Sequence, residues 1–309
     1  MKIIAENIHI ISKTTKEAIL NRDKFFIKNI VEKINEKKPD FIDLNVGPAR
    51  GKFSGSIEWL SNICQEINSD LDISFDSTNI EEIESGLKII KRKENSLINS
   101  TNADIERLEK YTDLACKYKT NIVGLTLNKE IGIPKESGQR LELALSIYEK
   151  CSEKGIENNK IYFDPLILPI MVEQSQAKEA LDTIRMLKES FDPPVNITIG
   201  LSNISNGAPL NLRPLINRVF LILALGCGLN SAIIDIFDDE LLRLIKVIET
   251  EKIEKEKDKL YIKIYNMMKN YEEIDDIQYD KNNKEESDII KTVKILLNKN
   301  IYSHSYTSQ

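Results

Sequence analysis

The sequence predicts an α/β fold, a (β/α)8 TIM barrel, and three observations carry this prediction. Short apolar runs alternate along the whole chain with amphipathic stretches of helical length. Each apolar run is nearly continuous, as is typical of parallel strands that are buried on both faces. A doubly wound open sheet is the competing fold, but it usually has a glycine-rich phosphate-binding turn after an early strand. Neither G-x-G-x-x-G nor G-x-x-x-x-G-K-[ST] occurs in the sequence.

The length and the composition are consistent with one globular barrel and some surplus chain. The 309 residues include 43 Lys and Arg and 49 Asp and Glu, which gives a net charge of −6. Length alone allows two domains, or a single barrel of ~250 residues with a modest remainder. A hydrophobic content of 41% excludes disorder as the main state. The acidic excess argues against a nucleic-acid-binding protein, which would normally carry a basic field.

Eight strands and eight helices are expected in alternation. The strands are the apolar runs rich in β-branched residues, and they are predicted at residues 2–8, 41–46, 72–75, 96–99, 121–127, 160–164, 196–201 and 231–236. The helices are the amphipathic stretches between these runs, and they are predicted at residues 15–37, 57–68, 80–93, 104–119, 140–154, 176–190 and 214–227, with a last helix that begins near Asp238. The predicted barrel therefore spans residues 1–240.

The segment 241–290 differs from the rest in composition. It holds 10 basic and 13 acidic residues in 50 positions, and it lies beyond the last glycine and the last proline. Tyr261, Tyr265, Met268 and Tyr271 are spaced as on one helical face. We expect either an exposed helix or helical hairpin that docks this aromatic stripe, or a contact surface for a partner or a second subunit. Residues 275–288 are polar enough to form a loop, and residues 291–309 form a terminal helix segment that closes the barrel.

The sequence contains no sign of a membrane span, a disulfide framework or a histidine-rich metal site. No stretch approaches the ~20 apolar residues that a spanning helix needs, and Glu6 interrupts the apolar start, so no signal-peptide core is expected. The four cysteines lie far apart and form no CxxC pair. We expect reduced, buried thiols in a cytoplasmic protein. Because only two histidines occur, no tightly bound metal is expected.

Polar residues follow six successive predicted strands, at the end of a barrel where catalytic groups lie. Any one Asp or Asn could simply cap a helix or a turn, but six in register on one rim would line a bowl with carboxylates and amides. Such a bowl suits a flat, nitrogen-rich heterocycle such as a pterin or a purine, and it suits a phosphate poorly. The residues are Asp43 and Asn45, Asp76, Asn99, Asn128, Asp164, and Ser202 with Asn203.

On these residues the chain resembles the methyltetrahydrofolate:corrinoid methyltransferases. The resemblance rests on the blocks IDLNVGPA (42–49), FDSTN (75–79), INSTNA (98–103), GLTLNK (124–129), GIPK (132–135), DPLILP (164–169), GLSNIS (200–205) and RPLINRVFL (213–221). It implies a pterin-binding, dihydropteroate-synthase-like barrel of about 240 residues. It also implies methyltetrahydrofolate or tetrahydrofolate as substrate, a cobalamin (corrinoid) carried by a separate partner protein, and a homodimer.

The resemblance also implies roles for individual residues. Asp76, Asn99 and Asp164 would hold the pyrimidine edge of the pterin, and Asn203 would reach N5, the nitrogen that bears the methyl group, as the catalytic residue. Further positions that match the family and are expected to bind substrate are Gly200, Ser202, Arg213, Asp43 and Asn128.

The implied reaction moves a methyl group between N5 of methyltetrahydrofolate and the cobalt of the corrinoid protein. A tertiary amine is a poor leaving group unless N5 is protonated or strongly hydrogen-bonded, so Asn203 and nearby polar groups would stabilise the developing charge. One alternative is a dihydropteroate synthase-like condensation, although DPLILPI lacks the glycines and the basic residue of that family's loop. A non-catalytic folate-binding subunit is the other alternative.

The sequence departs from the family pattern in three places. The first strand reads AENIHI where the family has G-E-R-I-N, which places Asn7 and His9 at positions of uncertain role. The loop NGAPLNL (206–212) differs from the usual Asn- and Gln-rich loop. The segment from Leu296 to Tyr302 resembles the family's closing segment but follows the eighth strand late. We therefore expect residues 243–288 to be an insertion into the last helix that serves the dimer or the corrinoid partner.

Overall fold

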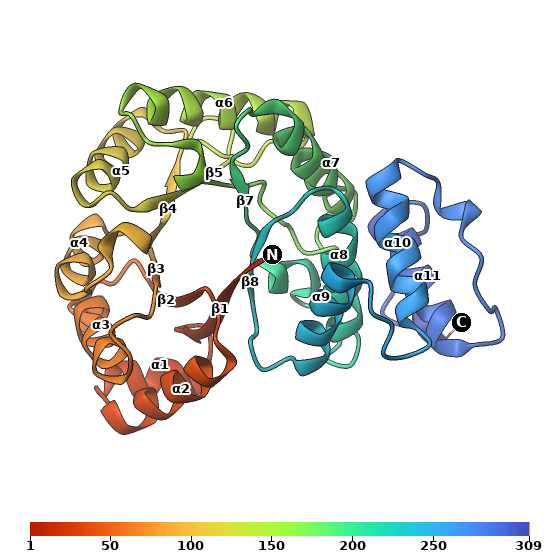
Figure 1. Cartoon of the computed structure of the whole chain (residues 1–309), viewed down its shortest axis with the longest axis horizontal. Coiled ribbons are helices and arrows are strands. Elements are labelled where there is room, and N and C mark those ends of the chain that lie inside the picture. The colour runs from red at the N-terminus through yellow and green to blue at the C-terminus, as the bar shows by residue number, and fades with distance from the viewer. Residues whose placement is uncertain (309) are drawn as a thin grey trace.

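The computed structural model describes residues 1–308 and consists of a parallel β-barrel inside a ring of helices (Figure 1). The strands are β1 (Lys2–His9), β2 (Phe41–Gly47), β3 (Ile73–Ser77), β4 (Leu97–Asn102), β5 (Asn121–Leu125), β6 (Ile161–Asp164), β7 (Asn196–Ile197) and β8 (Ser231–Ile234). Their order is β7-β6-β5-β4-β3-β2-β1-β8. The predicted α/β barrel is therefore confirmed.

The seam between β7 and β8 closes the barrel although β7 is only two residues long. The prediction continues this strand to Leu201, but Leu201 begins a 3₁₀ turn, and the chain from Thr198 to Gly200 pairs with β8 only at an isolated bridge between Gly200 and Ile233. There the Ile233 amide donates to the Ile199 carbonyl at 2.8 Å. The Ser231 hydroxyl adds a bond to the Ile197 carbonyl at 3.1 Å.

Helices follow the strands and cover the outside of the barrel. They are α1 (Lys13–Leu20), α2 (Lys24–Lys37), α3 (Ser56–Ile67), α4 (Ile80–Ile89), α5 (Ile105–Tyr118), α6 (Ser137–Glu153), α7 (Ser175–Ser190), α8 (Arg213–Gly226) and α9 (Asp239–Thr250). The prediction of one helix over residues 15–37 is wrong. Arg22 adopts a left-handed backbone with φ 51°, and the Asp23 carboxylate then accepts from the Phe26 amide at 3.0 Å and caps a new helix.

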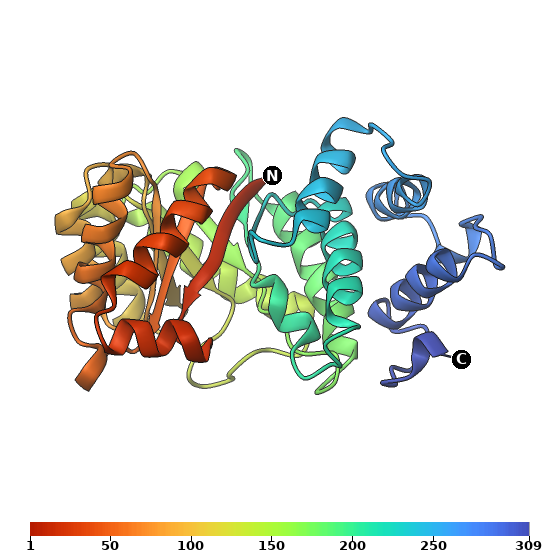
Figure 2. The ribbon, with the colours of Figure 1, turned by 90° about the horizontal axis from the view of Figure 1, so that it is seen from below.

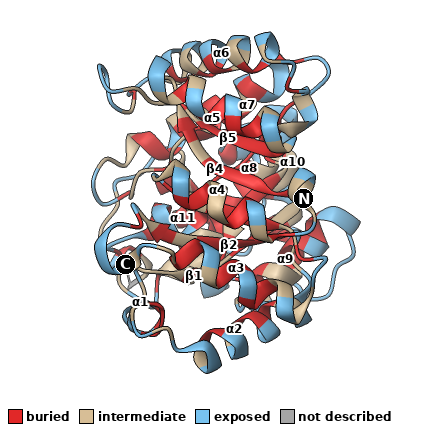
Figure 3. Ribbon diagram, turned by 90° about the vertical axis from the view of Figure 1, so that its left-hand side faces the viewer, coloured by how far each residue is buried: buried red, intermediate tan, exposed pale blue. Residues whose placement is uncertain are grey.

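The core has two parts, and the buried residues concentrate on the strands and on the helix faces that cover them (Figure 3). The larger part lies between the strands and the ring of helices. The smaller part fills the inside of the barrel, and its members are Ile4, Phe41, Leu97, Val123 and Tyr162. The barrel is therefore packed below its carboxyl-terminal mouth, as is typical of this fold.

A helical hairpin lies outside the ring, against α7 and α8 (Figures 1 and 2). It consists of α10 (Asp258–Asn270) and α11 (Lys284–Leu296). Of the expected aromatic stripe, Tyr261 and Met268 are buried, whereas Tyr271 is exposed. The prediction of a loop over residues 275–288 is wrong in its second part, because the Asn283 side chain caps α11 through the amides of Glu285 and Glu286. The predicted boundary at residue 240 lies in the first turn of α9.

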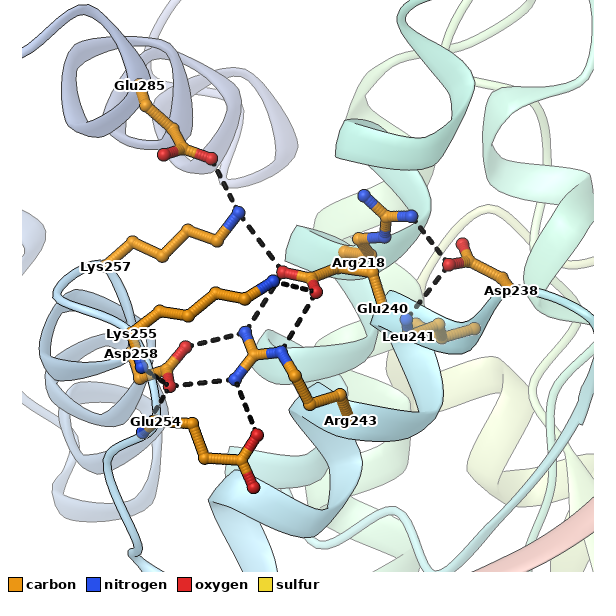
Figure 4. A network of polar contacts seen from close by, with 10 residues as sticks. All are labelled: Arg218, Asp238, Glu240, Leu241, Arg243, Glu254, Lys255, Lys257, Asp258 and Glu285. Atoms are coloured by element: carbon orange, nitrogen blue, oxygen red, sulfur yellow. Dashed lines mark hydrogen bonds and ion pairs between the residues drawn. The ribbon is translucent and has the colours of Figure 1, made fainter.

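A network of ion pairs fixes the start of the hairpin to the barrel (Figure 4). The Arg243 guanidinium of α9 donates to both carboxylate oxygens of Asp258, at 2.8 and 2.7 Å, and also binds Glu240. Asp258 is fully buried and accepts two backbone amides as well, from Glu254 and Lys255. Lys257 joins Glu240 to Glu285 of α11. Because these charges are paired and hydrogen-bonded, their burial is tolerated.

The other end of the hairpin packs closely on α8. A Cβ atom on Gly226 would lie 2.5 Å from the Met268 Cβ, so only glycine allows this approach. The Arg185 guanidinium of α7 donates to the Met268 carbonyl, and it also lies 3.7 Å from the sulfur of buried Cys227. Within residues 1–308, no helix is long and apolar enough to cross a membrane.

Candidate functional site

A cavity of about 590 Å³ opens at the carboxyl-terminal ends of the strands. Eight of the nine residues predicted to bind substrate line it, together with Asn45. They come from β2, β3, β4 and β6, from the loop between β7 and α8, and from the first residue of α8. The eight are Asp43, Asp76, Asn99, Asp164, Gly200, Ser202, Asn203 and Arg213.

The strand register explains why residues far apart in the sequence meet here. In the sheet, Asn45 lies beside Asp76, and Asp76 lies beside Asn99. The Asn45 amide donates to the Asp76 carboxylate at 2.5 Å. Because parallel strands run in one direction around a closed barrel, polar residues at their carboxyl ends form a ring.

Burial raises the pKa of the carboxyl groups in this ring. The pKa of Asp76 rises to about 7 through burial and the nearby charge of Asp164. Burial raises the pKa of Asp164 to about 6, and it raises that of Asp43 well above the ordinary range, where the charge of Asp76 adds to the effect. Asp76 and Asp164 therefore exchange protons near neutral pH, and a ligand that offers hydrogen-bond donors would favour their ionised forms.

Hydrogen bonds orient the carboxyl groups of Asp43 and Asp164 at the floor of the cavity. The Ser74 hydroxyl donates to Asp43 at 2.6 Å. The Leu166 amide donates to Asp164 at 2.8 Å, in a turn where Leu166 itself has a left-handed backbone with φ 64°. Both carboxyl groups keep further acceptor positions for a bound molecule.

Asn203 lies on the 3₁₀ turn η4 (Leu201–Ser205) that follows β7. Its side chain is exposed toward the cavity and makes no hydrogen bond within residues 1–308. A Cβ atom on Gly200 would lie 3.1 Å from the Asn203 amide nitrogen, so glycine leaves room for this side chain. Asn203 is therefore placed to bind a ligand.

Arg213 is the one Lys or Arg among the described residues that line the cavity. It begins α8, and its Nε donates to the Ala208 carbonyl at 2.8 Å, which ties the preceding loop to the helix. A single guanidinium faces several carboxyl groups here, so the cavity does not favour a strongly anionic ligand at its floor.

Asn128 is the predicted binding residue that the cavity does not include. Its side-chain carbonyl accepts the Ile131 amide at 2.8 Å, and its backbone pairs with Gly132. This asparagine closes a turn in the loop between β5 and α6, which is a common structural use of the residue. Asn128 therefore lies outside the cavity that the other eight residues line.

Glu6 and Asp235 also line the cavity and were missed at the sequence level. Glu6 accepts the Ser202 hydroxyl at 3.0 Å, and burial raises its pKa to about 7. Asp235 follows β8 and accepts the Asn7 amide at 2.6 Å, so Asn7 links the first strand to the last. The sequence contained a signal for both residues. Asp235 stands at the end of the eighth apolar run, as several predicted site residues do in theirs, and AENIHI keeps the Glu of the family's first strand.

His9 lines the same cavity, on the side of β1. Its Nδ1 accepts the Ser12 amide at 3.3 Å, and burial lowers the pKa of the ring. It is therefore a neutral ring near pH 7. Within the described residues, no group of His, Cys, Asp and Glu is arranged to hold a metal ion.

Residues 30–235 match the model of a protein family that is described as pterin binding enzyme. The chain belongs to the pterin binding enzyme family. This family member is 27% identical over 237 residues to methylcorrinoid:tetrahydrofolate methyltransferase of Eubacterium limosum, which covers 76% of this chain and 85% of the relative. The resemblance predicted from the sequence is thus confirmed.

Two further proteins are similar to this chain, one in sequence and one in fold. Methionine synthase of Mycobacterium leprae is 32% identical over 176 residues, which is 54% of this chain but only 14% of that enzyme. The solved dihydropteroate synthase of Coxiella burnetii, in complex with pteroic acid, superposes with a TM-score of 0.56 at 14% identity, over 88% of this chain and 94% of that one. At this identity the likeness shows the barrel fold alone.

Proposed function

We propose that this pterin binding enzyme transfers a methyl group between N5 of methyltetrahydrofolate and the cobalt of a corrinoid protein. The observation that carries the proposal is the cavity, where carboxyl and amide groups from β1, β2, β3, β4, β6 and the neighbouring loops surround one space. The similarity to methylcorrinoid:tetrahydrofolate methyltransferase over most of that relative supports the same pair of substrates.

The pterin ring would bind at the floor of the cavity. Its pyrimidine edge presents N–H donors next to a carbonyl acceptor. Asp76 and Asp164 offer carboxylate oxygens to the donors, and the Asn99 amide can donate to the carbonyl. A bound pterin would thus take up the hydrogen-bonding capacity that the three side chains present to the cavity.

Asn203 would act on N5 when the methyl group leaves. Its amide N–H or carbonyl can bond the nitrogen as that atom changes its charge and gains a proton, and such a bond lowers the barrier when it is strongest in the transition state. Glu6, with a pKa of about 7 and a bond to Ser202, lies on the same wall and can take part in the proton network. The corrinoid, carried by its own protein, would supply a cobalt(I) nucleophile that takes the methyl group.

The mouth of the cavity supports a partner that covers it. Ile11 and Leu210 line the cavity and are 84% and 77% exposed, and Phe237 beside β8 is 42% exposed. Apolar side chains around a polar cavity suit a partner that excludes water during the transfer. This partner would be the corrinoid protein.

The alternative of a dihydropteroate synthase-like condensation is less well supported by the cavity. That reaction expels pyrophosphate, whose charge calls for several cations or a metal ion. Arg213 is the one Lys or Arg among the described lining residues. A non-catalytic folate-binding subunit differs from our proposal only in turnover, so the assay below separates the two.

We also propose the division of the chain that the sequence suggested, with a barrel over residues 1–240, an inserted segment over 241–290 and a closing segment over 291–309. The inserted segment would serve a homodimer or the corrinoid partner. The position of α10 and α11 outside the ring supports such a role. Cys64, Cys151 and Cys227 are free and buried, which supports the proposed location in the cytoplasm.

The test of the function is methyl transfer from methyltetrahydrofolate to free cob(I)alamin, followed by absorbance, together with equilibrium binding of methyltetrahydrofolate. We expect both binding and transfer. Binding without transfer would favour the non-catalytic alternative, and the absence of both would overturn the proposal.

The Asn203→Ala variant tests the role assigned to that residue. We expect a fall in kcat of about 100-fold with the fold retained, because a bond to N5 in the transition state is lost. Asn211→Ala is the matched control, since Asn211 is exposed in the same loop but lies outside the cavity. Unchanged kinetics in Asn203→Ala would remove the residue from its role.

A further inference from the structure

The Arg140 side chain of α6 is fully buried behind the cavity and has no part in the mechanism described so far. It lies between two loops at the carboxyl end of the barrel, one from β5 to α6 and one from β6 to α7. A buried guanidinium is costly to keep, because it gives up its hydration and carries a full charge at neutral pH. Its retention therefore needs a reason.

The guanidinium of Arg140 holds the two loops together through their backbone carbonyls. Its Nε donates to the Pro134 carbonyl at 2.9 Å. Its Nη1 donates to the carbonyls of Pro165 and Leu166, at 3.0 and 3.3 Å. Its Nη2 donates to the side chain of Gln176, which in turn donates to the Lys135 carbonyl at 3.0 Å.

No carboxylate within residues 1–308 forms an ion pair with Arg140 at contact distance. The charges that act on it come from farther away, from Glu179, Asp164 and Glu173. The positive charge is thus held by neutral dipoles and remains available to act on its surroundings. A purely structural tie between two loops would not need a cation.

The loop that Arg140 holds is the one that carries Asp164. The Leu166 amide donates to the Asp164 carboxylate, while the Leu166 carbonyl accepts from Arg140. Leu166 has a left-handed backbone, an unfavourable conformation for a branched residue, and the bonds on both sides of it maintain this turn. The same charge lowers the pKa of Asp164 against the larger effect of burial.

We propose that Arg140 is a positioning residue for substrate binding, which fixes the orientation of Asp164 through the turn at Leu166. The guanidinium charge also favours the ionised form of the carboxyl group that this turn orients. The ligand in this proposal, the pterin of methyltetrahydrofolate, rests on the proposed function. The role of Arg140 is a separate step, and it requires only that Asp164 contacts the ligand as an anion.

The proposal predicts a pH dependence of binding that involves the other charged groups of the cavity. Asp164 faces Asp76 on β3, and the other titratable or charged residues that line the cavity are Glu6, His9, Asp43, Asp235, Asp238 and Arg213. The loss of affinity for methyltetrahydrofolate as the pH falls therefore reflects the coupled titration of all these groups. Removing the charge of Arg140 raises the pKa of Asp164, so binding is lost at a higher pH.

Three variants separate charge from loop geometry. Arg140→Gln removes the charge and most of the bonds, Arg140→Lys keeps the charge but cannot reach all the carbonyls, and Gln176→Met weakens the same loop contact with the charge in place. The measurement is the Kd of methyltetrahydrofolate between pH 5 and 8, with a thermal melt of each variant as a folding control.

We expect Arg140→Gln to bind about tenfold more weakly at pH 7, with the acidic midpoint about one pH unit higher. Arg140→Lys and Gln176→Met should bind several-fold more weakly and keep the wild-type midpoint. An unshifted midpoint in Arg140→Gln, or an equal shift in Arg140→Lys, would overturn the proposal. If Arg140→Gln does not fold, the affinity of Arg140→Lys decides instead, and a wild-type affinity in Arg140→Lys would overturn the proposal. Absence of binding by the wild type would instead overturn the proposed function.

Discussion

Asp76 illustrates the cost of building this cavity from carboxyl groups. Its pKa rises from an ordinary 3.8 to about 7 in the folded protein, mainly because it is buried. Between these two values the folded protein holds a proton that the unfolded chain has released. The free energy of unfolding therefore falls as the pH rises from about 4 to about 7. The residue that would recognise the substrate destabilises the empty protein at neutral pH.

The Asp76→Asn variant should be more stable than the wild type at pH 8 and similar to it at pH 4. We expect an increase in Tm of about 2–6 °C at pH 8, because the neutral amide avoids the burial of a charge. Affinity for methyltetrahydrofolate should fall at the same time. Asp70→Asn, at an exposed carboxylate paired with Lys91, is the control and should leave Tm nearly unchanged. If the difference in Tm between Asp76→Asn and the wild type were the same at pH 4 and pH 8, this account would be contradicted.

Sequence reasoning found most of the cavity because the ends of strands can be located from apolar runs. Asp76, Asn99 and Asp164 each end or follow such a run, and the barrel then brings them together. Asn128 shows the limit, since an asparagine after a strand closes a turn as readily as it lines a site. The proposed role of Arg140 could not be predicted from the sequence, because it depends on hydrogen bonds to backbone carbonyls of two loops that only folding brings together.

At the scale of elements, α8 is unusual because it is buried on nearly all sides. Its residues from Val219 to Ala224 are all buried, one face by the barrel and another by α10 and α11. A continuous apolar sequence is what such a helix requires. Its composition could have indicated that something covers its outer face, but the identity of the cover could not be read from the sequence.

The Gly226→Ala variant should loosen the hairpin. The new methyl group would lie 2.5 Å from the Met268 Cβ and 2.7 Å from the Tyr265 carbonyl oxygen, so α10 must move away from α8. We expect a loss of about 1–3 kcal/mol in the free energy of unfolding, measured by urea denaturation. Gly138→Ala is the control, because its new methyl group meets no atom within 4 Å other than those of its chain neighbours and of its own helix backbone. Equal effects of the two substitutions would contradict this packing argument.

Element boundaries were predicted less well than element types. The break between α1 and α2 depends on one left-handed residue, Arg22, and an amphipathic pattern continues across it without interruption. The start of α11 depends on a cap at Asn283 within a polar stretch. Such local backbone choices are decided by packing and capping, to which hydrophobic periodicity is insensitive.

On the scale of the whole molecule, the hairpin is part of the core and not a loose appendage. Ile264, Met267, Ile289 and Val293 are buried in the same cluster as the outer faces of the barrel helices. The side chain of Gln174, just before α7, also bonds the last turn of α11 at Ile295 and the chain after α11 at Asn298, Asn300 and Tyr302.

Truncation after Glu251 should therefore expose the outer face of α8 and cause the protein to associate. We expect larger species by size-exclusion chromatography and a lower Tm, since several fully buried apolar side chains lose their cover. The cavity should keep its residues, because none of them lies beyond Leu241. A truncated chain that stayed monodisperse with the wild-type Tm would contradict this view of the hairpin.

The position of Cys227 has a practical consequence for following this part of the molecule. Its thiol lies at the end of α8 beside the Arg185 contact with Met268, and burial raises its pKa to about 12. An alkylating reagent can reach this buried thiol only when the packing around the end of α8 opens, so the rate at which Cys227 is labelled reports how often that opening occurs. The labelling rate of Cys227 therefore measures local opening at the end of α8, where α7, α8 and the Met268 carbonyl of α10 meet.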